Sequence, residues 1–473
     1  MLLSKLLEDV KVLNTYEDRE ITDVTDKSGN IKDGCAFVCV KGARFDGHSV
    51  AADVLNQGAG AVIVTRDLGL KEQIIVENTR EAYALMCKNL FGRCVDKLQV
   101  VGITGTNGKT TTAFVIKDML KSLGVESGLI GTVKNMVGEK DFHTELTTPD
   151  PYEMHQLFKL MVEAGIKICV METSSQAFHQ KRLAGIYFAV GVFTNLTQDH
   201  LDYHGTIDEY KKCKKELFLK CEKAAFNNDD EASAYMMAGI KAPYSTYSIN
   251  NPADYKAENV ELYSDRVEYN LGDERIVFHI PGGFSVYNSL AAISAMRLLG
   301  YTEVEVESAI KCAKSVSGRV EVLKTNTDFS VIIDYAHSPD GLEKAINAVR
   351  GFTKGRVITL FGCGGDRDKT KRPKMGRIAA ELSDIVVVTS DNPRTEDPEE
   401  IIKDILEGID AQNKEIITIT DRSKAIEKAI SLAEKDDAIL LAGKGHETYQ
   451  VIGKERVHYD EREVVAKVLE GGF

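Results

Sequence analysis

The sequence predicts an α/β protein with several domains and mainly parallel sheets. Four apolar runs, at residues 329–333, 357–361, 385–388 and 438–441, are each followed directly by polar residues or glycine. Helical stretches separate these runs, which is typical of a parallel sheet covered on both faces. The apolar run at 168–171 repeats the arrangement nearer the middle of the chain. Because ligands bind beyond the carboxyl ends of the strands in open α/β sheets, we expect the chemistry there.

The length of the chain indicates more than one domain. Its 473 residues exceed the size at which a single hydrophobic core normally stops growing. The first part mixes short apolar runs, at 35–40 and 61–64, with glycine-rich turns. We therefore predict a first domain at 1–97, a second at 98–318 and a third at 319–473.

Charge and cysteine usage exclude several classes of protein. Lys and Arg number 59 against 72 Asp and Glu, and the resulting net charge of −13 comes without a basic stripe, which argues against nucleic acid as a partner. Charged residues interrupt the leucines of an amphipathic helix predicted at residues 1–9, and no apolar stretch is long enough to span a membrane. The nine scattered cysteines form no CxxC pair and fit a reducing compartment. We expect a cytoplasmic protein with no membrane or nucleic-acid partner.

A glycine-rich loop at residues 105–111 lies between an apolar strand at 98–104 and an amphipathic helix. Glycines let backbone N–H groups face phosphate oxygens, and a helix N-terminus favours negative charge. Lys109 can reach the β- and γ-phosphates of a nucleotide, and the Thr110 hydroxyl suits Mg²⁺. Ile103 stands where the common spacing requires glycine, so the loop is a shorter variant. The predicted ATP-binding residues of the loop are Gly105, Thr106, Asn107, Gly108, Lys109, Thr110 and Thr111.

Two further residues have the surroundings of metal ligands. Glu172 ends an apolar strand, where an unpaired carboxylate is costly unless a metal ion or a basic group lies near it. His200 follows the apolar run at 190–193 and has two carboxylates and a second histidine close by, so a hydrogen-bonded core residue and a metal ligand fit it equally. The lysines within residues 211–215 have the spacing of a solvated helix face.

In this order, these pieces resemble the Mur ligase family over nearly the whole chain. Besides the phosphate loop, the motifs that carry the resemblance are Thr147-Thr148-Pro149, Glu172-Thr173-Ser174-Ser175, residues 199–205, Gly318-Arg319-Val320-Glu321, residues 334–340, residues 365–369, Asp391-Asn392-Pro393-Arg394 and Gly443-Lys444-Gly445-His446-Glu447. The resemblance implies an N-terminal UDP-binding α/β domain, a central P-loop ATPase-like domain with a parallel or mixed sheet, and a C-terminal Rossmann-like domain. It also implies an ATP-dependent ligase that forms an amide through an acyl phosphate during peptidoglycan precursor synthesis.

The resemblance assigns residues to individual sites. The implied catalytic residues are Lys109, Glu172, His200 and Lys214. The implied Mg²⁺ ligands are Thr110, Glu172, His200 and a carbamylated Lys214. Carbamylation would turn this cation into an oxygen ligand, which Mg²⁺ prefers. Further implied contacts to ATP are Asn288, Arg319 and Asp334. The implied contacts to the UDP-linked dipeptide are Ser28, Thr147, Thr148, Ser174, Gln180 and Arg182. Near the uridine, Lys27-Ser28-Gly29 replaces the usual Asp-Ser-Arg, so only the serine carries over.

The motif at residues 391–394 marks members of the family that add meso-diaminopimelate. This amino acid carries a second carboxylate, which lysine lacks, and the arginine of the motif is a planar two-pronged donor for it. The implied contacts to diaminopimelate are Arg367, Asp391, Asn392, Pro393, Arg394, Gly443 and Glu447. The expected partners are therefore small molecules only, namely ATP, UDP-N-acetylmuramoyl-L-alanyl-D-glutamate and meso-diaminopimelate, and the protein is expected to be a monomer.

Other functions remain open at this point. The same ligase could use L-lysine, or the chain could resemble folylpolyglutamate synthetase, which shares the ATP core but lacks the first domain and the motif at 391–394. A dehydrogenase would explain glycines 362, 364 and 365 after a strand, but Arg367 stands where its fingerprint needs glycine or alanine. A P-loop switch protein that only hydrolyses nucleotide would leave the C-terminal motifs without a purpose.

Overall fold

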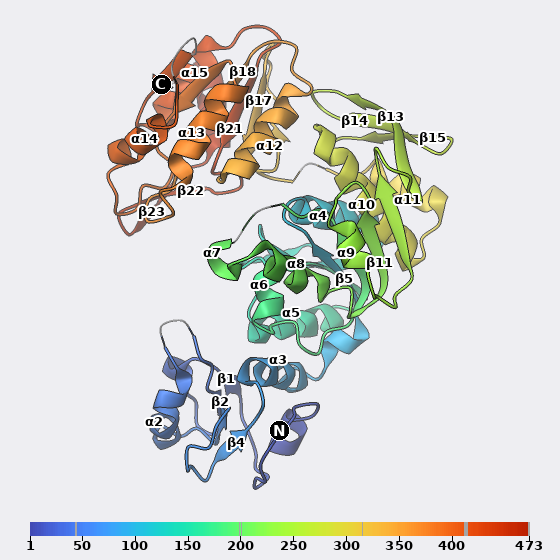
Figure 1. Cartoon of the computed structure of the whole chain (residues 1–473), viewed down its shortest axis with the longest axis vertical. Helices are drawn as coiled ribbons and strands as arrows, with labels where there is room; N and C mark the ends of the chain where they lie inside the picture. Colours follow the sequence, from blue (N-terminus) through green and yellow to red (C-terminus); the bar gives the residue numbers. More distant parts are fainter. Residues whose placement is uncertain (43–44, 198, 200, 315, 411–414, 472–473) are drawn as a thin grey trace. The chain divides into compact units, whose positions relative to one another are not determined.

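The computed structural model of this chain describes residues 1–42, 45–197, 199, 201–314, 316–410 and 415–471 (Figure 1). It divides into two compact units. The first consists of Met1–Tyr247, Asn251–Asp254 and Ala291–Val306, and the second of Ser248–Asn250, Tyr255–Leu290 and Glu307–Phe473. Both contain helices and parallel strands, and both also have some antiparallel strands, so the predicted α/β class is confirmed. The boundaries at residues 97 and 318 stay a prediction. Within the described ranges, no helix has the length and apolarity needed to cross a membrane.

The first unit begins with a small parallel sheet. Its strands, in order across the sheet, are β1 (Val24–Thr25), β2 (Ala36–Val38), β3 (Ala61–Val64) and β4 (Gln73–Ile75). The helices beside it are α1 (Leu3–Leu6), α2 (Ala51–Asn56) and α3 (Thr79–Leu90). Successive side chains of a strand point to opposite faces of the sheet. Val38 therefore packs with the apolar residues of α1 and α3 on one face, and Phe37 packs with those of α2 on the other. The amphipathic helix predicted at residues 1–9 amounts to the single turn α1.

A larger sheet is the centre of the rest of the first unit. Its strands lie in the order β12 (Tyr244–Ser248), β11 (Cys221–Asn227), β10 (Phe188–Phe193), β5 (Gln99–Thr104), β9 (Ile168–Glu172), β6 (Ser127–Ile130), β7 (Asn135–Val137) and β8 (Lys140–Phe142). Neighbours from β12 to β6 are parallel, and β7 and β8 are antiparallel. The runs predicted at 98–104, 168–171 and 190–193 are strands β5, β9 and β10. Their carboxyl ends therefore lie at one edge of the sheet.

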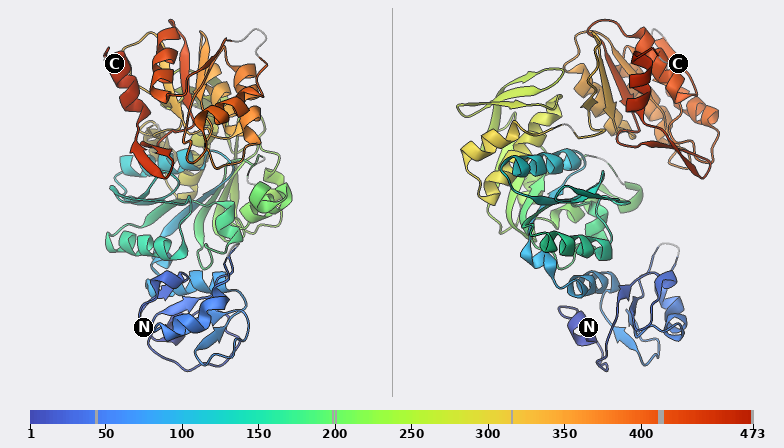
Figure 2. Two further views of the ribbon diagram at one scale, coloured as in Figure 1. Left: turned by 90° about the vertical axis from the view of Figure 1, so that its left-hand side faces the viewer. Right: turned by 180° about the vertical axis from the view of Figure 1, so that it is seen from behind.

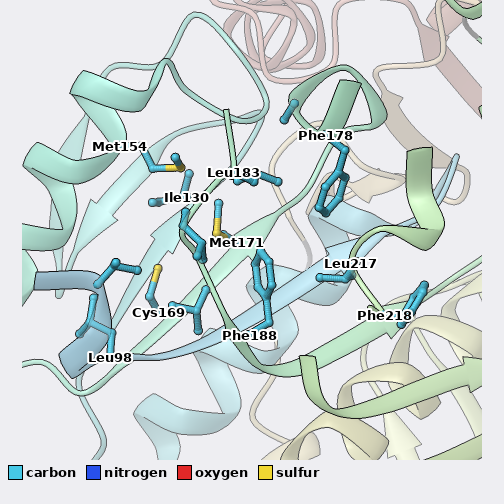
Figure 3. Packing of buried hydrophobic residues seen from close by; sticks show 14 of the residues in the cluster. Leu98, Ile130, Met154, Cys169, Met171, Phe178, Leu183, Phe188, Leu217 and Phe218 are labelled. Carbon is cyan, nitrogen blue, oxygen red and sulfur yellow. The ribbon is translucent and has the colours of Figure 1, made fainter. Parts of the chain in front are cut away.

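One face of this sheet packs on helices that follow β8 and β9. Figure 3 shows Met171 and Phe188 among Met154 of α5 (Pro151–Glu163) and Phe178 of α6 (Ser175–His179). All four side chains are essentially inaccessible to water. Burial of large apolar side chains contributes about 1.5–3 kcal/mol each, so this packing anchors the strand ends firmly. Helix α4 (Lys109–Ser122) contacts β5, β6 and β9.

The second unit contains an antiparallel meander and a parallel sheet. The meander consists of β13 (Tyr255–Leu262), β14 (Val267–Leu271) and β15 (Glu274–Phe278). The parallel sheet has the order β16 (Glu321–Val322), β17 (Ser330–Asp334), β21 (Ala438–Ala442), β18 (Val357–Phe361), β19 (Ile385–Val388) and β20 (Glu415–Thr418), with only β16 antiparallel. All four apolar runs predicted here are strands. Helix α10 (Gly283–Leu299) begins at Gly283, earlier than the start near Tyr287 that its apolar pattern indicates.

Helices cover both faces of this sheet. On one face lie α12 (Pro339–Arg350), α13 (Lys371–Leu382) and α14 (Pro398–Leu406), and on the other α15 (Arg422–Leu432) and α16 (Glu461–Leu469). The view from behind brings the deep-red α16 forward (Figure 2). Ile332 of β17 packs in the first layer and its neighbour Ile333 in the second. This double coverage explains why the strands are continuously apolar.

Candidate active site

The phosphate loop is shaped by two glycines and by the segment that follows β10. Gly105 has φ 153° and Gly108 has φ 85°, a backbone range that glycine adopts readily. A side chain at Gly105 would collide with the Thr194 hydroxyl. The Thr106 N–H donates to the Asn195 carbonyl at 2.9 Å, and the Thr194 hydroxyl donates to the Asn107 carbonyl at 2.6 Å. The loop is thus held in a defined conformation directly before α4.

Two lysines meet at one carbonyl of this loop. The Nζ atoms of Lys109 and Lys214 donate to the Gly105 carbonyl at 2.8 and 2.7 Å. Lys214 belongs to α8 (Ile207–Lys215), is 1% exposed and lies 4.4 Å from the centre of the Tyr210 ring. Burial, and then the charge of Lys109, lower the pKa of Lys214 well below its ordinary value. The prediction of a solvated face is therefore wrong for Lys214, because it shares the buried side of the helix with Tyr210.

Glu172 lies at the end of β9 beside the start of α4. Its Oε2 accepts hydrogen bonds from the hydroxyls of Thr110 at 2.9 Å and Thr132 at 3.0 Å. Its Oε1 accepts from the Thr132 N–H at 2.8 Å, and any side chain at Gly131 would collide with it. Thr132 is absent from the sequence predictions. It follows β6, so the rule that polar residues gather at the carboxyl ends of strands could have found it.

The oxygen atoms at this point suit a hard cation. Thr110 and Glu172, two of the predicted Mg²⁺ ligands, are within hydrogen-bond distance of each other, and Mg²⁺ prefers carboxylate and hydroxyl oxygens. Lys214 would join them only as a carbamate, because an ammonium group repels a cation. The prediction for His200 falls outside the described residues. Within the part that is described, no three His, Cys, Asp or Glu side chains gather as a metal site.

The residues predicted to contact the UDP-linked dipeptide lie around the same strand end. The Thr148 hydroxyl donates to the Glu172 carbonyl at 2.8 Å and accepts from the Ser174 N–H at 3.0 Å. Arg182 donates through Nη1 to the Thr148 carbonyl. Burial lowers the pKa of Arg182, and its Nε is buried without a partner among the described residues. A buried guanidinium with an open donor is suited to an anionic ligand.

Two more predicted contacts border this cluster, and a third, Ser28, lies between β1 and β2 of the small sheet. The hydroxyls of Thr147 and Thr132 are 3.1 Å apart, and Gln180 Nε2 donates to the Tyr203 hydroxyl at 3.0 Å. Ser28 begins a short 3-10 turn and is half-buried. Asp26, which the predictions omit, has a buried Oδ1 without a partner in the described part of the chain, and burial followed by the charge of Asp150 raises its pKa.

In the second unit, Arg394 has a constrained backbone and a guanidinium aimed at a glycine turn. Its φ is 51°, in the left-handed region. The N–H donates to Val451 at 3.0 Å, and the carbonyl accepts from Gly453 at 2.7 Å, so the hairpin β22 (Tyr449–Ile452) and β23 (Glu455–His458) clamps this residue. Nη1 donates to the Gly365 carbonyl at 2.9 Å.

Arg367 lies near this guanidinium. A side chain on Gly364 would meet Arg394 Nη1 at 2.8 Å and the Arg367 side chain at 3.7 Å. Arg367 itself is exposed, and its Nη1 donates to the Asp366 carbonyl at 3.1 Å. Two arginines therefore flank one glycine, and together they present positive charge suited to an anionic group.

Acidic groups gather beside these arginines. Asp391 is 8% exposed, and its Oδ2 is buried without a partner in the described ranges. Asn392 Nδ2 donates to Glu447 at 2.9 Å, and the fully buried Lys444 donates to Asn392 Oδ1 at 3.1 Å. Any side chain at Gly443 would stand 2.7 Å from Asp391 Oδ2. The structure thus brings together Asp391, Asn392, Gly443 and Glu447, as predicted, and adds Lys444.

The remaining predicted ATP contacts of the second unit lie at the same sheet edge or on α10. Asp334 accepts from the N–H groups of Val320 and Ala336, each at 2.8 Å, and burial raises its pKa. Val320 has φ 45°, a strained value for a β-branched residue. The Arg319 guanidinium lies 5.0 Å from the centre of the Tyr335 ring. Asn288 is 4% exposed on α10.

Comparisons with known proteins give a consistent result. The family model described as Mur ligase middle domain matches residues 103–296, and the one described as Mur ligase, glutamate ligase domain matches residues 318–445. The chain is 44% identical to UDP-N-acetylmuramoyl-L-alanyl-D-glutamate--2,6-diaminopimelate ligase of Clostridium perfringens, and both chains are covered completely. A Clostridium acetobutylicum protein with the same name, numbered 1, is 43% identical over the whole of both chains. A solved structure of a ligase with this name has a TM-score of 0.72 at 29% identity and covers 95% of each chain.

Proposed function

This chain belongs to the Mur ligase family, and from that premise we propose that it adds meso-diaminopimelate to UDP-N-acetylmuramoyl-L-alanyl-D-glutamate with ATP hydrolysis. The product is a UDP-linked tripeptide for peptidoglycan. Members of the family act as ATP-dependent ligases in the synthesis of this polymer, and relatives at this level of identity share one name. The enzyme is proposed to work in the cytoplasm as a monomer, and its nine free cysteines fit a reducing compartment.

The observation that carries the choice of amino acid is the charge pattern around residues 391–394. Arg394 and Arg367 flank Gly364, whereas Asn392 donates to the carboxylates of Glu447 and Asp391. Diaminopimelate carries an ammonium and a carboxylate at each end, so it needs both signs of charge in its site. Lysine lacks the distal carboxylate, so its binding would leave an arginine without an anionic partner, and this would lower the affinity for lysine.

Activation of the substrate carboxylate is proposed to take place at the phosphate loop. A carboxylate and an amine do not form an amide at neutral pH, so the carboxylate must first accept the γ-phosphoryl group of ATP and become an acyl phosphate. Two anions have to approach each other in this step. Lys109 and the N-terminus of α4 would neutralise charge on the phosphates, and Arg182 would hold the UDP-linked dipeptide nearby.

The acidic groups of the second unit are proposed to hold the amino acid. Asp391, Glu447 and the Gly443 carbonyl would bind the distal ammonium, while Arg394 and Arg367 would bind carboxylates. The free α-amine then attacks the acyl phosphate, the C–N bond forms, and phosphate leaves as the C–O bond breaks. The amine must lose a proton, and no residue of this chain is assigned to that role.

Mg²⁺ would be held by Thr110, Glu172, His200 and a carbamate on Lys214, and it supplies charge neutralisation at the phosphates. Lys214 is fully buried beside Lys109, which favours its neutral amine, and a neutral amine is the form that adds CO₂. As a carbamate, Lys214 would bring two oxygens to the loop in place of a second positive charge beside Lys109.

The test is ADP release with the UDP-linked dipeptide and a panel of diaminopimelate, lysine and ornithine. We expect release with diaminopimelate and little with the other two. Release with lysine in preference to diaminopimelate would assign the chain to the lysine-adding alternative. Release without any amino acid would indicate a nucleotide hydrolase, and release with folate substrates a folylpolyglutamate synthetase.

A further inference from the structure

A buried ion pair lies beneath the amino-acid site. Arg422, at the start of α15, and Glu461, at the start of α16, are 2% and 1% exposed. Arg422 Nη2 lies 2.8 Å from Glu461 Oε1, and Nε donates to the same oxygen at 2.9 Å. Neither residue belongs to a motif or site described above. Replacement of such a pair by apolar residues is often neutral or stabilising, so stability alone does not explain it.

The other donors of Arg422 reach two strand ends. Nη1 donates to the Ser390 carbonyl at 3.2 Å, and Nη2 donates to the Ala442 carbonyl at 2.9 Å. Ser390 and Ala442 directly precede Asp391 and Gly443, which the proposed function places around the distal ammonium. Arg422 therefore contacts both halves of that binding site through the backbone.

Hydrogen bonds between the strands do not link these two strand ends directly. β19 and β21 do not pair with each other, because β18 lies between them and pairs with both. The segments that follow β19 and β21 are therefore separated by the width of a strand at the edge of the sheet. The Arg422 guanidinium spans this separation and links the two segments. Asp391 Oδ2 approaches Gly443 across this separation.

Arginine has the shape that this role needs. Its rigid planar fork can serve several acceptors at fixed angles, whereas a lysine ammonium is a single point on a flexible chain. Burial opposes the charge of Arg422, but Glu461 and then Asp391 raise its pKa, so it stays cationic. Glu461 holds Nε and Nη2 on one side of the fork, while Nη1 donates to the Ser390 carbonyl and Nη2 also donates to the Ala442 carbonyl.

We propose that Arg422, held by Glu461, is a positioning residue that sets the spacing between Asp391 and Gly443 and thereby the affinity for the amino acid. This inference rests on the proposed function, because it assumes that these two residues bind the distal ammonium. It predicts an effect on one substrate, the amino acid, without a comparable effect on ATP.

The neighbouring residue on α16 provides an internal comparison. Arg462 Nη2 lies 2.6 Å from Glu321 Oε2, and the same oxygen accepts from the Gly318 N–H at 2.7 Å. Arg462 thus supports the turn that carries Arg319, a proposed ATP contact, and its Nη2 also donates to the Gly445 carbonyl at 3.2 Å. A second matched pair, Arg356 and Asp437, lies before the amino ends of β18 and β21, with 2.7 Å between Nη2 and Oδ2.

The experiment measures KM for each substrate, kcat and Tm for Arg422→Lys, Glu461→Gln, Arg462→Lys and Arg356→Lys. We expect Arg422→Lys and Glu461→Gln to raise KM for diaminopimelate about tenfold or more, and KM for ATP by less than about twofold. Arg462→Lys should act mainly on KM for ATP. Arg356→Lys should lower Tm and leave every KM unchanged.

Three outcomes would overturn the proposal. The first is an unchanged KM for diaminopimelate in folded Arg422→Lys. The second is a parallel rise of all KM values, and the third is failure of both conservative variants to fold, which would assign the pair to folding alone. Failure of the proposed function is distinguishable, because wild-type protein would then release no ADP in response to diaminopimelate.

Discussion

The two edges of the parallel sheet in the second unit use similar residues in opposite ways. At the amino edge, Asp437 accepts from the Arg356 N–H at 2.6 Å and from its guanidinium at 2.7 Å. Asp384 accepts from the Val357 N–H at 2.7 Å and from Arg350 at 2.5 Å. At the carboxyl edge, by contrast, buried atoms of Asp391, Arg319 and His446 have no partner within the described residues.

This difference separates groups that hold the sheet together from groups that are open to ligands. An unpaired buried polar atom costs about 1–3 kcal/mol, so a fold keeps several of them at one place only if something else binds there. The amino edge should therefore respond to mutation through stability, and the carboxyl edge through substrate binding.

The largest effect on activity is expected at the carboxyl edge of the larger sheet in the first unit, which extends the comparison beyond the second unit. Lys109→Ala and Glu172→Ala should each lower the rate of ligation by about 10³-fold or more, since each removes charge that faces phosphates or a metal ion. A coupled ADP assay measures the rate, and Tm reports folding. Lys121→Ala, an exposed lysine of the same helix α4, is the control. Near-normal turnover in either variant would remove that residue from the site.

The next effect concerns the choice of amino acid at the carboxyl edge of the second unit. Arg394→Ala should reduce the preference for diaminopimelate over lysine by about 2–5 kcal/mol, because the arginine is the proposed partner of the extra carboxylate. Competition between the two amino acids measures it. Arg377→Ala, on the exposed side of α13, should leave the preference unchanged. If Arg394→Ala keeps the wild-type preference, Arg394 is not the selector.

A third prediction tests the proposed carbamate on Lys214. Lys214→Ala should lower activity about 10²-fold, and added acetate should restore part of it by supplying carboxylate oxygens to the metal. Lys212→Ala, an exposed neighbour on α8, should be fully active without acetate. Full activity of Lys214→Ala would contradict the proposed carbamate, whereas loss without rescue would favour a role for the unmodified amine.

The smallest expected effect is on stability, at the amino edge of the parallel sheet in the second unit. Asp437→Asn should lower the free energy of unfolding at pH 7 by about 1–3 kcal/mol without changing any KM. Burial raises the pKa of Asp437, but hydrogen bonds from Arg356 and backbone N–H groups outweigh this and lower it below the ordinary value of 3.8. Because the pKa is lower in the folded chain, the stabilisation is present above that value and is lost as the pH falls below it.

Urea denaturation of wild type and Asp437→Asn at several pH values checks this prediction. The difference in unfolding free energy should narrow between pH 5 and pH 3, within about a pH unit of the ordinary pKa. A constant difference across that range would show that the charge of Asp437 does not matter. A change in KM for diaminopimelate would break the division between the two edges.

The strands were predictable because local patterns determine them. β18 and β19 have the bounds that their apolar runs indicate, since fully buried parallel strands need no polar positions. The phosphate loop was also predictable, because glycines and lysine stand in order between strand and helix. Helix α1 is shorter than predicted. It ends at Leu6 although Leu7 also packs in the core, and Asp9 has a left-handed φ of 66°, which does not continue a helix.

Tertiary contacts were not predictable in the same way. Helical spacing places Lys214 with its exposed neighbours, and only the packing of Tyr210 shows which side is buried. Thr132 reaches Glu172 because β6 lies beside β9, and this neighbour relation comes from the folded sheet. The pair Arg422 and Glu461 joins two helices far apart in sequence, so no local signal marks it.

The way the chain alternates between its two compact units has a consequence for synthesis on the ribosome. The first unit is incomplete when Tyr247 has been made, because Ala291–Val306 also belongs to it. Buried residues such as Met296 come from that late segment. The hydrogen bond from Lys223 Nζ to the Leu298 carbonyl, 2.7 Å long, also cannot form before Leu298 has been synthesised. A nascent chain halted after Asp254 would therefore expose apolar surface that the finished protein buries. Co-translational folding of this unit can finish only after part of the second unit has already emerged.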